Sequence, residues 1–249
     1  MRAKIASNFN ITGEDMWYGY RRTKFDFHGR EAWVVEPSVA PRPEKPWTWT
    51  MQWAEAFVDR TGVLDLLREG FHHVTIDLFP TRMNDEGIAA AAAFQAFLTE
   101  ELGFARKANL VGMSWGGFFS VRYAATHPDN VRRVYLDAPL LTFDGFGDPS
   151  PERIGPWAAS MPPGGWKSDP RMPINLSENL AKAGIPVLLL YGGQDQTVPP
   201  AKNAEAFLAR FKAAGGCVEV ENRSLFGHHP HGVDPDKTAR IVNFFRAST

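Results

Sequence analysis

The sequence predicts an α/β fold in which a mostly parallel central sheet carries helices on both faces. Short apolar runs typical of buried strands alternate with segments whose apolar residues recur at helical spacing. A glycine-rich turn at residues 112–116 joins one such run to a helical segment, as expected in a strand–turn–helix unit. The chain has 249 residues, 44% of them hydrophobic, which is enough for one large core. We therefore expect one domain over residues 1–249.

The first half of the chain predicts the beginning of this sheet. Phe25 and Phe27 alternate with polar residues before a turn at Gly29, so residues 23–36 predict an antiparallel hairpin. The patterns that follow predict a proline-rich connection over 37–46, a strand at 47–51, a helical region at 54–67, a strand at 74–78 and a helix at 88–102.

The second half continues the alternation but contains one long exception. Its patterns predict strands at 108–113, 131–137, 186–191 and 217–222 and a helix around 204–211. Residues 139–173 are rich in Pro, Gly and aromatic residues and have no clear period. Because they fall between the sixth and seventh predicted strands, we interpret them as a lid or substrate-binding insertion over the carboxyl ends of the strands. The alternative is an ordered surface loop that Trp157 and Trp166 attach to the body of the protein.

Composition excludes several classes of function. The formal net charge is −1 and the 27 basic residues are spread along the chain, so no nucleic-acid surface is indicated. The longest apolar run, 88–94, is too short to cross a bilayer, and the amino-terminal residues do not resemble a signal peptide. We therefore expect no membrane span and a cytoplasmic protein. A single cysteine, Cys217, excludes an internal disulfide.

Residues 112–116 read Gly-Met-Ser-Trp-Gly and match the nucleophile elbow pattern G-x-S-x-G. The turn between strand and helix is so tight that the two glycines avoid collisions a Cβ would cause. Ser114 at its centre is expected to take a strained conformation that exposes its hydroxyl group. Because a strand-like run precedes the motif and a helical pattern follows it, Ser114 is the candidate nucleophile.

A nucleophilic serine needs a base, and the base needs an acid that orients it. In a strand–elbow–helix fold the three are expected in the order serine, acid, histidine, on loops after later strands. Asp195 follows the strand predicted at 186–191, and Asp137 at the end of an earlier strand is a rival acid. The loop after the last predicted strand carries three candidate bases, which are His228, His229 and His231.

Together these motifs resemble the α/β-hydrolase family over nearly the whole chain. In that family the base usually follows a glycine directly, so the resemblance implies His228 as base and Asp195 as acid. Residues 45–49, 70–72, 136–139 and 228–231 are also similar to a bacterial esterase-like branch associated with carbohydrate breakdown. Members of that branch tend to carry Arg after the nucleophile, where this chain has Trp115.

The resemblance also implies an oxyanion hole made of two backbone N–H groups. One comes from the residue after the nucleophile, Trp115, and the other from the loop after the strand at 47–51, for which Trp49 is the candidate. The tryptophans at 47, 49, 53 and 115 are core aromatics or, near the elbow, a platform for an acyl group or sugar ring.

These residues predict a serine hydrolase that cleaves a small-molecule carboxylic ester through an acyl-enzyme. The resemblance to the esterase-like branch implies a carbohydrate acyl ester as one such substrate. The same triad also serves peptidases, amidases and acyltransferases, and a non-catalytic ligand-binding relative is a further alternative. We expect no cofactor. A metal site at the three histidines is the weaker interpretation, because their spacing is not helical and no carboxylate cluster lies beside them in the sequence. The oligomeric state does not follow from the sequence.

Overall fold

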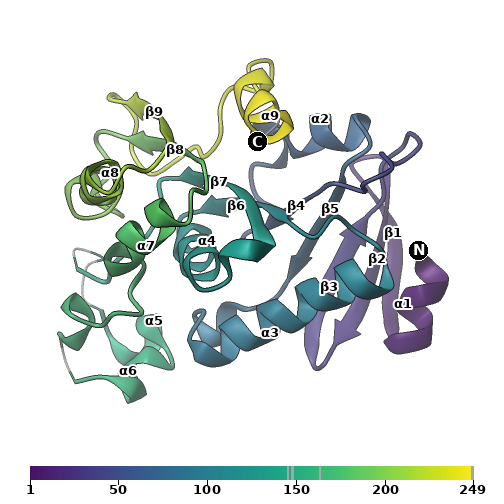
Figure 1. Ribbon diagram of the computed structural model, residues 1–249, viewed down its shortest axis with the longest axis horizontal. Coiled ribbons are helices and arrows are strands. Elements are labelled where there is room, and N and C mark those ends of the chain that lie inside the picture. The colour runs from purple at the N-terminus through teal and green to yellow at the C-terminus, as the bar shows by residue number, and fades with distance from the viewer. Residues whose placement is uncertain (145, 147–148, 163, 248–249) are drawn as a thin grey trace.

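Nine strands of the described residues form one mixed sheet, in the order β1-β2-β3-β5-β4-β6-β7-β8-β9 (Figure 1). The computed structural model describes residues 1–144, 146, 149–162 and 164–247. The strands are β1 (Ile11–Trp17), β2 (Tyr20–Phe27), β3 (Arg30–Val35), β4 (Trp47–Thr50), β5 (His72–Ile76), β6 (Ala108–Met113), β7 (Val131–Asp137), β8 (Val187–Gly192) and β9 (Val218–Arg223).

Pairing is antiparallel at the amino-terminal edge and parallel elsewhere. β1, β2, β3 and β5 pair antiparallel in that order, whereas β5, β4, β6, β7, β8 and β9 pair parallel. The prediction of a mostly parallel α/β sheet is therefore confirmed. β1 is not predicted from the sequence, because this edge strand is largely exposed and lacks an apolar alternation.

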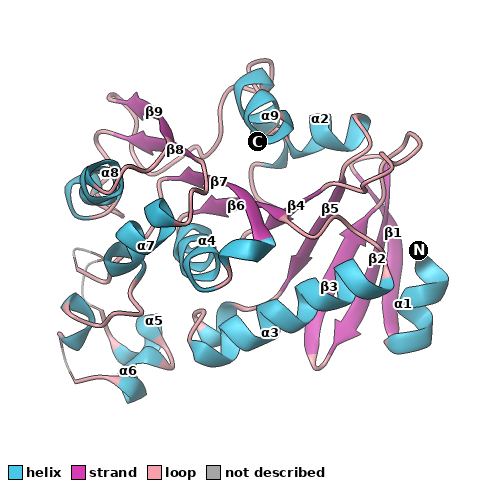
Figure 2. Cartoon of the chain, in the orientation of Figure 1, coloured by secondary structure: helices cyan, strands magenta, loops and turns pink. Residues whose placement is uncertain are grey.

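Helices cover both faces of the sheet, as Figure 2 shows. Phe94 and Phe118, from the helices that begin at residues 85 and 115, pack in the larger of two buried apolar clusters. Leu66 and Phe245, from the helices that begin at residues 63 and 239, pack in the smaller cluster. The α-helices are α1 (Arg2–Asn8), α2 (Val63–Arg68), α3 (Asp85–Ala96), α4 (Trp115–Thr126), α5 (Pro151–Ile154), α6 (Trp157–Ser160), α7 (Ser177–Lys182), α8 (Ala204–Ala213) and α9 (Ala239–Arg246).

Two predicted helical segments differ in length from the observed ones. The region predicted at 54–67 contains only a short 3₁₀ turn and α2, because the chain turns through positive φ at Trp53, Phe57 and Gly62. The helix predicted at 88–102 is observed as α3 followed by a π-helical turn (Phe97–Glu101). None of the described helices combines the length and the apolar composition that a membrane-spanning helix needs.

The long connection predicted at 139–173 lies between β7 and β8 and contains the short helices α5 and α6. The segment was predicted to lie between the sixth and seventh strands. It lies between the seventh and eighth, because the sheet contains one additional strand, β1, at its beginning. Phe143 and Trp157 pack against Phe118 of α4, with ring centroids 5.4 Å and 5.7 Å away. The Trp157 indole also donates a hydrogen bond to the carbonyl of Arg82 at 2.9 Å. Buried aromatic contacts thus hold this segment against the body of the protein.

Candidate active site

Ser114 lies on the turn between β6 and α4, with φ 51° and ψ −117°. This positive-φ conformation costs about 1–3 kcal/mol for a non-glycine residue and is held by the surrounding structure. A Cβ on Gly112 would lie 2.6 Å from the Ser120 hydroxyl and 2.7 Å from the Gly116 carbonyl. The elbow therefore needs glycine at position 112, as the motif predicted.

A chain of hydrogen bonds links Ser114 to a histidine and a carboxylate. The Nε2 atom of His228 lies 3.1 Å from Ser114 Oγ, and its Nδ1 lies 2.6 Å from Asp195 Oδ2. The other oxygen of Asp195 accepts hydrogen bonds from the backbone N–H groups of Thr197 and Val198, at 2.9 and 2.8 Å. Because an ionised carboxylate only accepts, Nδ1 of His228 carries the hydrogen and Nε2 presents its lone pair to the serine.

The parallel sheet brings these three side chains together. Ser114 follows β6, Asp195 follows β8 and His228 follows β9, and the carboxyl ends of parallel strands share one edge of the sheet. Asp195 and His228 are both buried, so the imidazole has little contact with water. The arrangement can remove a proton from Ser114 and return it to a leaving group.

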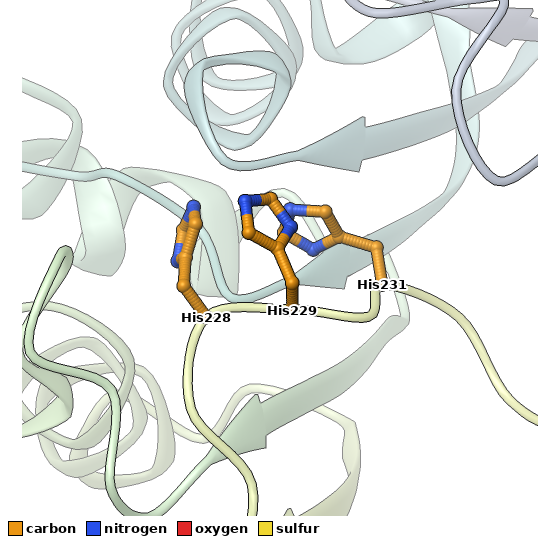
Figure 3. A group of neighbouring side chains, drawn as sticks. All are labelled: His228, His229 and His231. Atoms are coloured by element: carbon orange, nitrogen blue, oxygen red, sulfur yellow. The ribbon is translucent and has the colours of Figure 1, made fainter.

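The other two histidines of the loop lie beside His228, but neither forms a hydrogen bond with Ser114. Figure 3 shows the three rings side by side on one loop. His229 is exposed and stacks on Phe57 at 5.6 Å, and partial burial together with the neighbouring imidazoles lowers its pKa. His231 is buried, and its Nδ1 lies 3.0 Å from Asp137 Oδ1.

Asp137 contacts His231 and not His228. Its carboxylate is fully buried and also accepts from Tyr135 Oη and Gly232 N, each at 2.6 Å, and from Arg223 at 3.1 Å. Burial alone would raise its pKa, but the hydrogen bond from His231 and the charge of Arg223 outweigh burial and hold the pKa below its ordinary value. Through its hydrogen bonds with His231 and Gly232, Asp137 thus anchors the histidine loop at the end of β7.

The structure places a different backbone N–H beside the elbow than the sequence predicted. Trp49 lies inside β4 with strands paired on both sides, so it is not in the loop after the strand. The Met51 N–H donates to the Val111 carbonyl at 3.1 Å. Gln52 is the first residue beyond these sheet contacts, and its backbone nitrogen would lie 3.4 Å from a Cβ on Gly116. Gln52 therefore replaces Trp49 as the second candidate oxyanion donor.

Trp115, the first candidate donor, begins α4, where backbone N–H groups have no partner within the helix. Its indole is buried among aromatic rings, including Phe79 and Phe146 at 5.9 and 5.5 Å. Trp47 and Trp49 stack on each other in the core. Of the four tryptophans considered for a platform, only Trp53 is exposed, at 42%.

A cleft of about 440 Å³ begins at Gln52 and Trp53. It is lined by Trp33 and Trp53 together with polar side chains. The other lining residues are Glu31, Ala54, Glu55, Ala56, Thr75, Ile76 and Asp77. The cleft thus adjoins the second candidate oxyanion donor and offers both aromatic surface and hydrogen-bond acceptors.

His72 and His73 lie in β5, away from the histidine loop. Both are buried, and burial lowers the pKa of His72 to about 4 and that of His73 to about 3. The His73 ring nitrogen Nδ1 lies 2.8 Å from Thr48 Oγ1. These neutral imidazoles are part of the sheet packing.

Comparison with known proteins identifies the fold. Residues 48–156 match the sequence model of a family described as the alpha/beta hydrolase fold. A Bacteroides ovatus protein provisionally assigned as a dipeptidyl aminopeptidase IV superposes with a TM-score of 0.71 at 14% identity, over 91% of this chain and 35% of its own. No protein of curated function matches the sequence.

Two other solved structures agree with this fold. Dipeptidyl peptidase 4 of Porphyromonas gingivalis has a TM-score of 0.65 at 16% identity, over 91% of this chain and 35% of its own. The uncomplexed acylaminoacyl peptidase of Pyrococcus horikoshii has a TM-score of 0.62 at 15% identity. The match covers 98% of this chain and 42% of the peptidase chain. The chain thus spans less than half the length of these proteins. It has the α/β-hydrolase fold.

Proposed function

We propose that this α/β-hydrolase-fold protein is a serine hydrolase that cleaves a carboxylic ester through an acyl-enzyme intermediate. The observation that carries the proposal is the continuous hydrogen-bond chain from Ser114 through His228 to Asp195. Such a chain gives a serine hydroxyl the base it lacks in water and fixes the tautomer of that base.

The proposed reaction uses each residue at a defined atom. His228 Nε2 accepts the hydroxyl proton as Ser114 Oγ attacks the ester carbonyl carbon, and Asp195 stabilises the imidazolium that forms. The backbone N–H groups of Trp115 and Gln52 stabilise the negative oxygen of the tetrahedral intermediate. When the intermediate collapses, the C–O bond to the alcohol breaks and His228 returns the proton to the leaving oxygen. A water molecule, activated by the same histidine, then hydrolyses the acyl-serine.

The substrate that we propose is an acylated, hydroxyl-rich alcohol such as a carbohydrate ester. The cleft beside Gln52 supports this class, because the exposed indole of Trp53 offers a flat apolar surface. The carboxylates of Glu31 and Asp77 line the same cleft and could accept hydrogen bonds from hydroxyl groups.

Amide or peptide hydrolysis is the second candidate. The structural neighbours support it, because their names describe a dipeptidyl peptidase and an acylaminoacyl peptidase. Their identity to this chain is 16% or less, so they support the fold more strongly than the substrate. Acyl transfer would use the same acyl-enzyme with another alcohol or amine in place of water.

The first test is hydrolysis of a p-nitrophenyl acyl ester by the wild type and by Ser114→Ala, with Ser7→Ala as the control for an exposed serine. The proposal predicts turnover by the wild type and the control and a loss of at least about 10³-fold for Ser114→Ala. Full turnover by Ser114→Ala would eliminate the mechanism.

A second test separates the candidate substrates. An ester and an amide of the same acyl group are offered side by side, together with acetylated sugars. An esterase cleaves the ester and leaves the amide, whereas a peptidase or amidase cleaves both. Ligand binding without turnover or covalent labelling would favour the non-catalytic alternative.

A further inference from the structure

We propose that His228, His229 and His231 bind a zinc ion, and that the bound ion turns the enzyme off. One ring nitrogen from each histidine can be chosen so that all three lie within 4.8 Å of one another (Figure 3). Imidazole nitrogen is a common zinc ligand. The loop thus gathers a three-histidine donor set although the spacing in the sequence is not that of a helix.

Two of the three rings are already held in the tautomer that a metal needs. Asp195 accepts from His228 Nδ1 at 2.6 Å, and Asp137 lies 3.0 Å from His231 Nδ1. Because carboxylates accept hydrogen bonds, both rings carry hydrogen on Nδ1 and leave the Nε2 lone pair available. A carboxylate behind a ligating histidine is the usual arrangement around protein-bound zinc, where it fixes the ring and raises the basicity of the ligand.

His229 supplies the third nitrogen and the route of entry. It is exposed, and its ring forms no hydrogen bond with any residue that the structure describes. Zn–N distances of about 2.0–2.1 Å place tetrahedral ligand atoms roughly 3.3 Å apart, so nitrogens that now lie within 4.8 Å of one another must approach by up to about 1.5 Å. Rotation of the exposed His229 side chain can bring its own nitrogen closer to those of His228 and His231. The remaining position can be taken by water or by Ser114 Oγ, which lies 3.1 Å from His228 Nε2.

The effect on catalysis rests on the proposed function. The lone pair on His228 Nε2 either accepts the proton of Ser114 or binds zinc, and it cannot do both. Zinc binding therefore removes the base from the reaction without any change of fold. Magnesium and calcium prefer oxygen ligands and are expected to have no such effect.

The test measures zinc binding directly as well as activity. Competition with a chromophoric chelator gives the dissociation constant for wild type, His229→Gln and His28→Gln, and ester hydrolysis is followed in the same zinc titration. His28 is an exposed histidine in the turn between β2 and β3 and serves as the matched control. We expect one zinc per wild-type chain, inhibition with the same midpoint, and recovery of activity on addition of EDTA.

His229→Gln is expected to keep its basal activity and to bind zinc at least about tenfold more weakly, whereas His28→Gln should behave like the wild type. Equal zinc affinity in wild type and His229→Gln, or no binding by the wild type, would overturn the inference. Binding that depends on His229 in a protein without esterase or amidase turnover would leave the metal site standing and refute the proposed function instead.

Discussion

The hydrogen bond between Asp195 and His228 leads to a quantitative prediction for Asp195→Asn. The side-chain oxygen of asparagine can still accept from the N–H groups of Thr197 and Val198, so the loop keeps its geometry. The amide NH₂ then takes the place of Oδ2, 2.6 Å from His228 Nδ1. Because an amide nitrogen donates, the imidazole must move its hydrogen to Nε2, which then cannot accept the proton of Ser114.

We expect this substitution to lower kcat by about 10⁴-fold with a smaller change in KM. At 1.36 kcal/mol per factor of ten, the loss corresponds to about 5 kcal/mol of transition-state stabilisation. Initial rates with a p-nitrophenyl acyl ester measure it, and circular dichroism checks the fold. Asp236→Asn changes an exposed carboxylate and should retain wild-type rates. A loss smaller than tenfold for Asp195→Asn would refute the assignment of Asp195 as the orienting acid.

The remaining predictions concern stability. Asp137→Ala leaves Arg223 and His231 without their buried acceptor and should lower the free energy of unfolding by about 3–5 kcal/mol in a urea titration; a change below about 1 kcal/mol would contradict this role. His73 has a pKa of about 3 in the folded state and about 6.5 when unfolded, so the unfolded state binds more protons between these values. Its contribution to stability is present above pH 6.5 and falls by up to about 1.4 kcal/mol per unit as the pH drops toward 3, and His73→Gln should flatten the acid limb of a plot of Tm against pH. Gly112→Ala places a Cβ 2.6 Å from the Ser120 hydroxyl and should cost about 1–3 kcal/mol, measured by thermal denaturation; an unchanged Tm would show that the elbow tolerates a side chain.

The sequence predicted the central features of the fold because they depend on local pattern and chain order. The G-x-S-x-G turn lies between β6 and α4, and the strands after it are close to their predicted bounds. These strands are parallel, so the loops that follow them meet at one edge of the sheet. Ser114, Asp195 and His228 come together for that reason.

The features that the sequence did not predict depend on three-dimensional pairing. β1 is an exposed edge strand whose polar sequence shows no alternation, so only its partner β2 defines it. The end of the strand predicted at 47–51 lies within one residue of the observed end of β4, but Trp49 is a residue inside that strand, so the candidate oxyanion donor moves to Gln52. A search for the first residue beyond the strand end, rather than for a residue type, would have found it.

The role of Asp137 could not be settled from sequence either. Both Asp137 and Asp195 follow strands, and the loop after β9 offers three histidines. Only the path of that loop decides the pairing, with His228 toward Asp195 and His231 toward Asp137. The second pair is also what places a further imidazole beside the proposed base.

The most direct test of the central claim is the intact mass of the protein after incubation with a fluorophosphonate in the presence of EDTA. An activated Ser114 predicts a single adduct on the wild type and on Ser7→Ala, and none on Ser114→Ala. An equal adduct on Ser114→Ala would place the reactive group elsewhere. The absence of any adduct on the wild type would contradict the proposal that His228 and Asp195 activate this serine.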